Sequence, residues 1–99
     1  MNTSVHPFPK SKDFSPKVRQ KFASKIFNDL YKMSADGPGV SRATYGPGET
    51  AAMKYCAEVA ESEGLSSYFD EAANLVIELT GEAPDAPFII CGSHLDTVP

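Results

Sequence analysis

Residues 64–92, GLSSYFDEAANLVIELTGEAPDAPFIICG, decide the fold, because all the strand candidates of the chain lie within them. Two short β-type runs at 67–71 and 74–79 are joined by a short reversal, which predicts a β-hairpin. After a loop, residues 87–92, PFIICG, form a continuous apolar run. Such a run is typical of a strand that is covered on both faces, as in the middle of an α/β sheet.

A helix is predicted before these strands, from Ser15 to about Met33. Ser15 is a favourable N-cap, and Pro16 suits the first helical position because its missing N–H needs no partner there. Apolar residues then recur at spacings of three and four, which predicts one buried stripe. The residues of this stripe are Val18, Phe22, Ile26, Phe27 and Leu30.

A second helix is predicted to begin within residues 47–50 and to end at Gly64. Gly64 can adopt the left-handed conformation of a Schellman cap, with Leu65 as its hydrophobic contact. The order of helix, helix, strand, strand and strand predicts a layered α/β unit. The expected buried face of the second helix consists of Ala52, Met53, Cys56, Val59 and Ala60.

The composition is ordinary for a soluble globular chain, and 99 residues make one small domain or part of a larger one. The formal net charge of −4 argues against nucleic acid or an anionic membrane as a partner. No apolar stretch is long enough for a membrane span, and the first residues lack the apolar core of a secretory signal. Residues 1–14 are polar, carry two prolines and are expected to form a flexible N-terminal arm. Cys56 and Cys91 are interpreted as reduced, buried residues of a cytoplasmic protein, with a disulfide as the minor alternative.

The loop at residues 37–48 contains four glycines but does not match a phosphate-binding motif. Its glycine spacing differs from the nucleotide-binding patterns, no strand precedes it, and no lysine follows its last glycine. Turns that join the two helices are the simpler interpretation. Arg42 is the one residue of this loop that could bind an anion, although a solvated surface arginine is the favoured interpretation.

His94 and Asp96 follow the apolar run and are the candidate functional residues. Ligands of open α/β sheets bind outside the carboxyl ends of strands, and Gly92 and Ser93 are small enough to allow close approach. His94 could offer one ring nitrogen to a metal ion, while Asp96 orients the ring through the other nitrogen. On the spacing alone, a simple polar turn is the favoured interpretation and a metal ligand is the alternative.

A complete metal site needs more ligands than this chain offers near His94. A catalytic zinc ion has three protein ligands and a water molecule. The other histidine, His6, lies in the N-terminal arm and is assigned no role. The remaining ligands are therefore expected outside these 99 residues. The glutamates of the second helix are interpreted as a solvated face, and they are Glu49, Glu58, Glu61 and Glu63.

Several motifs, taken in order, resemble the hydantoinase/carbamoylase family of amidohydrolases, within the aminoacylase- and carboxypeptidase-like metallopeptidase superfamily. The resemblance covers roughly residues 15–99, and the combined order is more specific than any single motif. Ser41 departs from the family pattern where Thr is common, and Ala73 departs from it by replacing a glycine. The motifs that carry the resemblance are Gly39-Val40-Ser41-Arg42 with Tyr45, Glu63-Gly64-Leu65, Asp70 with Asn74-Leu75, and Gly92 to Pro99.

The resemblance implies that residues 15–99 are the N-terminal portion of a mixed-sheet, metallopeptidase-like catalytic domain. The rest of that domain and an inserted lid or dimerisation domain would belong to a longer protein. The resemblance further implies two divalent ions (zinc, manganese, cobalt or nickel). It implies that His94 is a ligand to one ion and that Asp96 is the catalytic residue that orients His94. The implied protein is a cytoplasmic homodimer that acts on a small ureido or amide substrate.

The function implied by the resemblance is hydrolysis of a linear C–N bond in an N-carbamoyl amino acid or a related ureido compound. The 99 residues alone are expected to be inactive, because most of the metal ligands would be missing. A peptidase or deacylase of the same superfamily is the nearest alternative, since the His-x-Asp pattern is common to them. A non-catalytic α/β interaction module is the alternative from another class, and the apolar strand predicted so near the last residue argues against it.

Overall fold

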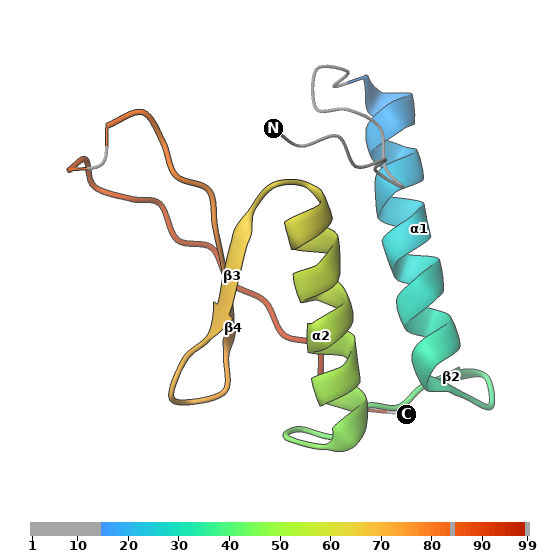
Figure 1. The fold of residues 1–99 in the computed structure, drawn as a ribbon. Helices are drawn as coiled ribbons and strands as arrows, with labels where there is room; N and C mark the ends of the chain where they lie inside the picture. The colour runs from blue at the N-terminus through green and yellow to red at the C-terminus, as the bar shows by residue number, and fades with distance from the viewer. Residues whose placement is uncertain (1–14, 84, 99) are drawn as a thin grey trace.

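The computed structural model describes residues 15–83 and 85–98, and the fold is mixed α/β (Figure 1). The helix α2 lies between the helix α1 and the β3–β4 hairpin (Figure 1). Within the described residues, neither helix is long and apolar enough to cross a membrane. The arm expected at residues 1–14 lies outside the described part of the chain. The elements are α1 (Pro16–Ser34), β1 (Ala35–Asp36), β2 (Gly39–Val40), α2 (Pro47–Ser62), β3 (Ser66–Phe69) and β4 (Leu75–Glu78).

The helix α1 begins where the sequence predicts. The Ser15 hydroxyl oxygen accepts a hydrogen bond from the backbone N–H of Val18 at 3.3 Å, and Pro16 takes the first helical position. Phe27 departs from the predicted stripe, because its side chain is 73% exposed. Consecutive helical residues point about 100° apart, so Phe27 turns away from the face that its predecessor presents. The buried or partly buried members of the stripe are Val18, Phe22, Ile26 and Leu30.

The helix α2 begins with a cap that the sequence analysis missed. Gly46 is the N-cap, makes no side-chain capping bond, and is followed by Pro47. Glu49 in the first turn accepts a hydrogen bond from the backbone N–H of Tyr45 at 2.8 Å. Glu49 is only 8% exposed, so its interpretation as part of a solvated face is wrong. Its carboxylate also complements the positive end of the helix dipole.

The helix α2 ends in the predicted Schellman cap. Gly64 has a φ of 83°, and its N–H donates to the carbonyl oxygen of Glu61 at 3.0 Å. The N–H of Leu65 donates to the carbonyl oxygen of Ala60 at 2.9 Å. These two bonds satisfy carbonyl groups that the last turn would otherwise leave unpaired. The predicted face of α2 contains the buried residues Ala52 and Ala60 and the partly buried residues Met53, Cys56 and Val59.

The predicted hairpin is confirmed, because β3 and β4 pair in antiparallel register with Phe69 opposite Leu75. Asp70 closes the connection between the two strands. Its carboxylate accepts hydrogen bonds from the backbone N–H groups of Ala72 and Asn74 and from the Asn74 side-chain amide, at 2.9, 2.9 and 3.0 Å. The loop is therefore held by polar contacts within five residues.

Residues 87–92 do not form the predicted buried strand. Phe88, Ile89 and Ile90 are 81%, 97% and 78% exposed, and the segment pairs with no strand among the described residues. Cys91 is exposed rather than buried, and both cysteines are free. A strand forms only where a neighbour accepts and donates its backbone hydrogen bonds. The apolar pattern indicates a surface suited to burial, but it does not supply that neighbour.

Candidate functional site

His94 and Asp96 lie in contact, as their spacing suggests. His94 Nδ1 is 2.9 Å from Asp96 Oδ1 and 3.2 Å from the backbone carbonyl oxygen of Asp96. A carbonyl oxygen and an ionised carboxylate can only accept hydrogen bonds. Nδ1 therefore carries the proton and donates it, which leaves Nε2 of the neutral ring with a free lone pair.

The outer edge of the His94 ring is open to solvent. The His94 side chain is 80% exposed, and the Asp96 side chain is 33% exposed. The space beside Gly92 is also open, since no atom lies within 4 Å of the place where a Cβ would stand. His94 can thus present Nε2 to a metal ion while Asp96 orients the ring from behind, an arrangement that is common at metal centres.

Thr44 is a partner of Asp96 that the sequence analysis missed. Its hydroxyl donates a hydrogen bond to Asp96 Oδ2 at 2.6 Å. Each carboxylate oxygen of Asp96 therefore has its own donor: Oδ2 accepts from Thr44, and Oδ1 accepts from His94. The hydrogen bond from Thr44, followed by the bond to His94, lowers the pKa of Asp96 below the ordinary value of 3.8. Asp96 is therefore ionised at neutral pH, as both contacts require.

Arg42 holds the segment that carries His94 and Asp96. Its side chain is buried, with 8% exposed, so the interpretation as a solvated surface arginine is wrong. Its Nε donates to the carbonyl oxygen of Leu95 at 2.8 Å, and its Nη1 donates to the carbonyl oxygen of Leu30 at 3.2 Å. The guanidinium thereby ties the last turns of α1 to the peptide between the two candidate site residues.

The backbone of Arg42 adds an isolated antiparallel bridge to Thr97. The Thr97 N–H donates to the Arg42 carbonyl oxygen at 2.8 Å, and the Arg42 N–H donates to Thr97 Oγ1 at 2.9 Å. The Thr97 hydroxyl in turn donates to the carbonyl oxygen of Val40 at 3.2 Å. We call Arg42, Thr44, Leu95, Asp96 and Thr97 the clasp, because their contacts join two segments far apart in the sequence.

The glycine-rich loop supports the clasp and forms turns, as its simpler interpretation predicts. A two-residue strand, β1, does precede the loop, contrary to the sequence analysis, and it pairs with β2 inside the loop as a short hairpin. The N–H of Ser41 donates to the carbonyl oxygen of Ser34 at 2.9 Å. The next turn is tight, since a Cβ at Gly46 would lie 3.0 Å from the carbonyl oxygen of Ala43. This loop therefore places Arg42 and Thr44 beside the C-terminal segment.

The described residues do not gather a complete set of metal ligands. Among residues 15–83 and 85–98, no three His, Cys, Asp or Glu side chains gather closely enough to hold a metal ion. His94 Nε2 is nevertheless a suitable donor, because its lone pair is fixed in position by the bond at Nδ1. A catalytic site would need further donors from other residues.

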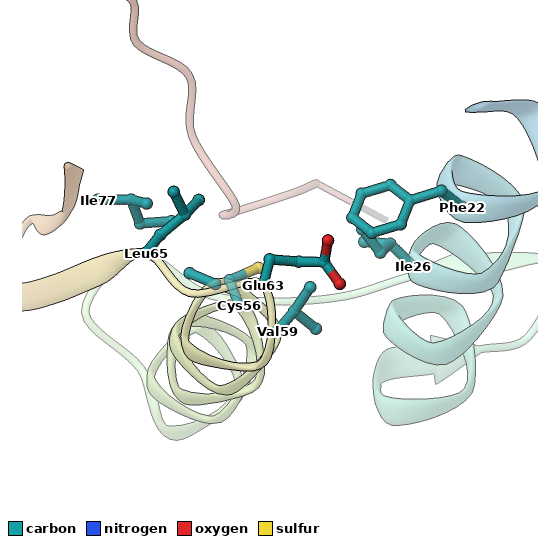
Figure 2. Close-up of a pocket in the computed structure, with 8 residues that line it drawn as sticks. Phe22, Ile26, Cys56, Val59, Glu63, Leu65 and Ile77 are labelled. Carbon is teal, nitrogen blue, oxygen red and sulfur yellow. The ribbon is translucent and has the colours of Figure 1, made fainter. Parts of the chain in front are cut away.

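A separate hollow lies between α1, α2 and the hairpin (Figure 2). Its volume is about 240 Å³, which is below the usual size of a small-molecule site. Figure 2 shows Glu63 extending from the end of α2 toward Phe22 and Ile26 of α1. One carboxylate among apolar side chains is not a set of converging polar groups, so the hollow is a gap in packing. Its lining consists of Phe22, Ile26, Cys56, Val59, Ala60, Glu63, Leu65 and Ile77.

Two curated proteins match the chain. It is 34% identical over 82 residues to the N-carbamoyl-L-amino-acid amidohydrolase of Paenarthrobacter aurescens, a match that covers 83% of this chain and 20% of that protein. It is 38% identical over 60 residues to the N-carbamoyl-L-amino acid amidohydrolase of Geobacillus stearothermophilus, covering 61% of this chain and 15% of that protein. No family model matches the chain, and no solved structure matches it significantly. The chain spans a fifth or less of the length of these relatives, and over most of its own length it is similar to N-carbamoyl-L-amino-acid amidohydrolases.

Proposed function

We propose that this chain is part of a binuclear metal-dependent amidohydrolase that cleaves the linear C–N bond of N-carbamoyl amino acids or related ureido compounds. The observation that carries the proposal is the His94–Asp96 pair, with Nδ1 held by a carboxylate and Nε2 open to solvent. The names of the two matching proteins support the substrate class. The resemblance of the motif order supports the metal dependence, a cytoplasmic location and a homodimer.

The residues of this chain would have two separate roles in such an enzyme. His94 would bind one of two divalent ions through Nε2, and Asp96 would fix the ring and keep its proton on Nδ1. When bound, the ions would supply an activated water and stabilise the negative charge that develops on the carbamoyl oxygen. The other ligands and the general base would come from residues outside this chain.

The test uses the longer protein that contains this chain, loaded in turn with manganese, zinc, cobalt or nickel. We expect ammonia release from N-carbamoyl amino acids, and no release of free amino acid from dipeptides or N-acyl amino acids, which a peptidase or deacylase would cleave. His94→Ala should abolish turnover, whereas Asp96→Asn should lower metal affinity or activity about 10- to 100-fold. His6→Ala is the matched control and should leave the rate unchanged.

Two results would contradict the proposal. The first is the absence of ammonia release from every ureido substrate with every metal. The second is cleavage of dipeptides or N-acyl amino acids in preference to ureido compounds, which would assign the protein to the peptidase or deacylase alternative. His94→Ala with undiminished turnover would remove His94 from the site even if the substrate class were right.

A further inference from the structure

We propose that Thr44 is a positioning residue, which acts through Asp96 to fix the nitrogen of His94 that faces a ligand. The metal identity of that ligand rests on the proposed function, but the positioning itself does not. The contacts that carry the inference are the Thr44 hydroxyl on Asp96 Oδ2 at 2.6 Å and His94 Nδ1 on Asp96 Oδ1 at 2.9 Å.

The His94 ring needs a fixed hydrogen-bond partner to keep one orientation. It is 80% exposed, so packing does not hold it, and a 180° rotation of its ring would place carbon atoms where the two nitrogens stand. Asp96 can be that partner only while its own carboxylate is held in one orientation. A carboxylate on a short side chain can rotate about χ2, and then neither oxygen would stay in line with Nδ1.

Thr44 removes this freedom at Asp96. Its hydroxyl takes Oδ2, which leaves Oδ1 directed at His94. The clasp fixes the backbone on both sides of Asp96, since Arg42 holds the carbonyl oxygen of Leu95 and the N–H of Thr97. The Asp96 carbonyl oxygen, 3.2 Å from Nδ1, is therefore a second fixed acceptor for the same proton.

A competing account is that His94 and Asp96 orient each other without help, as in a simple polar turn. The two accounts differ in a measurable way. If the pair is sufficient, removing the Thr44 hydroxyl changes nothing at His94. If Thr44 positions the pair, the neutral ring divides its proton between Nδ1 and Nε2 once that hydroxyl is absent.

The test is long-range ¹H–¹⁵N NMR of the His94 ring in the 99-residue chain, at about pH 8, where an ordinary imidazole is neutral. The unmodified chain and Thr44→Ser, which keeps the hydroxyl, should both show the proton on Nδ1. Thr44→Val, which keeps the shape, should lower the ratio of Nδ1–H to Nε2–H about fivefold, as expected for the loss of one hydrogen bond. Circular dichroism of each variant checks that the helices remain.

The inference is overturned if Thr44→Val retains the Nδ1–H signature with the helices intact. It is also overturned if Thr44→Ser, which keeps the hydroxyl, loses that signature. The same spectrum of Ala43→Gly, one residue before Thr44 and without a hydroxyl to lose, is the control for general loosening of the loop. The NMR measurement needs neither metal nor turnover. A change at His94 without ureidohydrolase activity would refute the proposed function alone, and activity without a change at His94 would refute this inference alone.

Discussion

Residues 87–92 and residues 94–97, which include three members of the clasp, are neighbours in the sequence and differ sharply in the structure. The first segment is the most apolar run of the chain, yet Ile89 is 97% exposed. The second is polar and short, yet Arg42, 55 residues away, fixes its backbone at Thr97. In Figure 1 the chain leaves β4, extends as a loop, and returns past the hairpin and behind α2 toward β2.

The difference shows that polar and apolar contacts need different surroundings to hold a segment in place. A buried arginine can satisfy two carbonyl groups with one side chain, so a few residues suffice to hold a segment. Apolar burial is proportional to the area removed from water, so an apolar segment needs a broad facing surface. Within the described residues, no such surface faces residues 87–92.

The largest expected effect comes from breaking the clasp at its centre. Arg42→Ala removes the guanidinium donor from the carbonyl groups of Leu95 and Leu30, which should lower the free energy of unfolding by about 2–4 kcal/mol. Arg42→Lys keeps the charge but not the fork of donors, and should recover only part of the loss. Denaturant unfolding measures each value. Arg19→Ala, on the exposed face of α1, is the control, and a loss for Arg42→Ala no larger than the control would contradict the role of the clasp.

A smaller loss is expected from Asp70→Ala, which tests whether a polar contact also holds the hairpin loop. The side-chain and backbone hydrogen bonds from Asn74, and the backbone bond from Ala72, lower the pKa of Asp70 below 3.8. Its contribution to stability is therefore present above that value and is lost as the pH falls through the lowered native pKa. Thermal unfolding of the chain should show this loss in acid, and the difference from Asp70→Ala should vanish there. Glu71→Ala is the matched control, and equal melting temperatures for both variants at pH 7 would contradict the prediction.

A modest gain is expected from Ala73→Gly in the same loop. Ala73 has a φ of 66°, a left-handed conformation that glycine adopts without steric cost. The substitution should raise the free energy of unfolding by about 0.5–1 kcal/mol, after allowing for the greater freedom of glycine in the unfolded chain. Ala72→Gly, one residue earlier and without a positive φ, should instead be neutral or destabilising. A loss of stability from Ala73→Gly would show that the loop does not hold this conformation.

The smallest effect is expected in the exposed apolar segment. Ile89→Ser should change the free energy of unfolding by less than about 0.5 kcal/mol, because its side chain contacts solvent rather than a core. Leu30→Ala, at a buried apolar position of α1, is the comparison and should cost about 2 kcal/mol or more. A loss above 1 kcal/mol for Ile89→Ser would mean that residues 87–92 pack against the molecule.

The features that could be predicted from the sequence are those with local causes. The N-cap at Ser15, the Schellman cap at Gly64 and the hairpin closed near Asp70 each depend on residues within a few positions of one another. The pairing of His94 with Asp96 also has a local cause, because the two residues are only two positions apart in the sequence.

The features that were missed depend on residues that are distant in the sequence. No local pattern distinguishes a buried Arg42 from a solvated one, because its partners Leu30 and Leu95 are 12 and 53 residues away. Thr44 gives no signal for the same reason, as Asp96 lies 52 residues further on. The apolar run at 87–92 gave a signal for burial, but pairing requires a neighbouring strand that the run itself cannot specify.

Hydrogen exchange of individual amides tests the central claim most directly, because it reports both segments in one experiment. We predict that the amides of Arg42 and Thr97, which donate to Thr97 Oγ1 and to the Arg42 carbonyl oxygen, are protected to nearly the full free energy of unfolding. The amides of residues 88–91 should exchange at rates close to those of an unstructured chain. Protection of residues 88–91 together with free exchange at Arg42 and Thr97 would contradict the account.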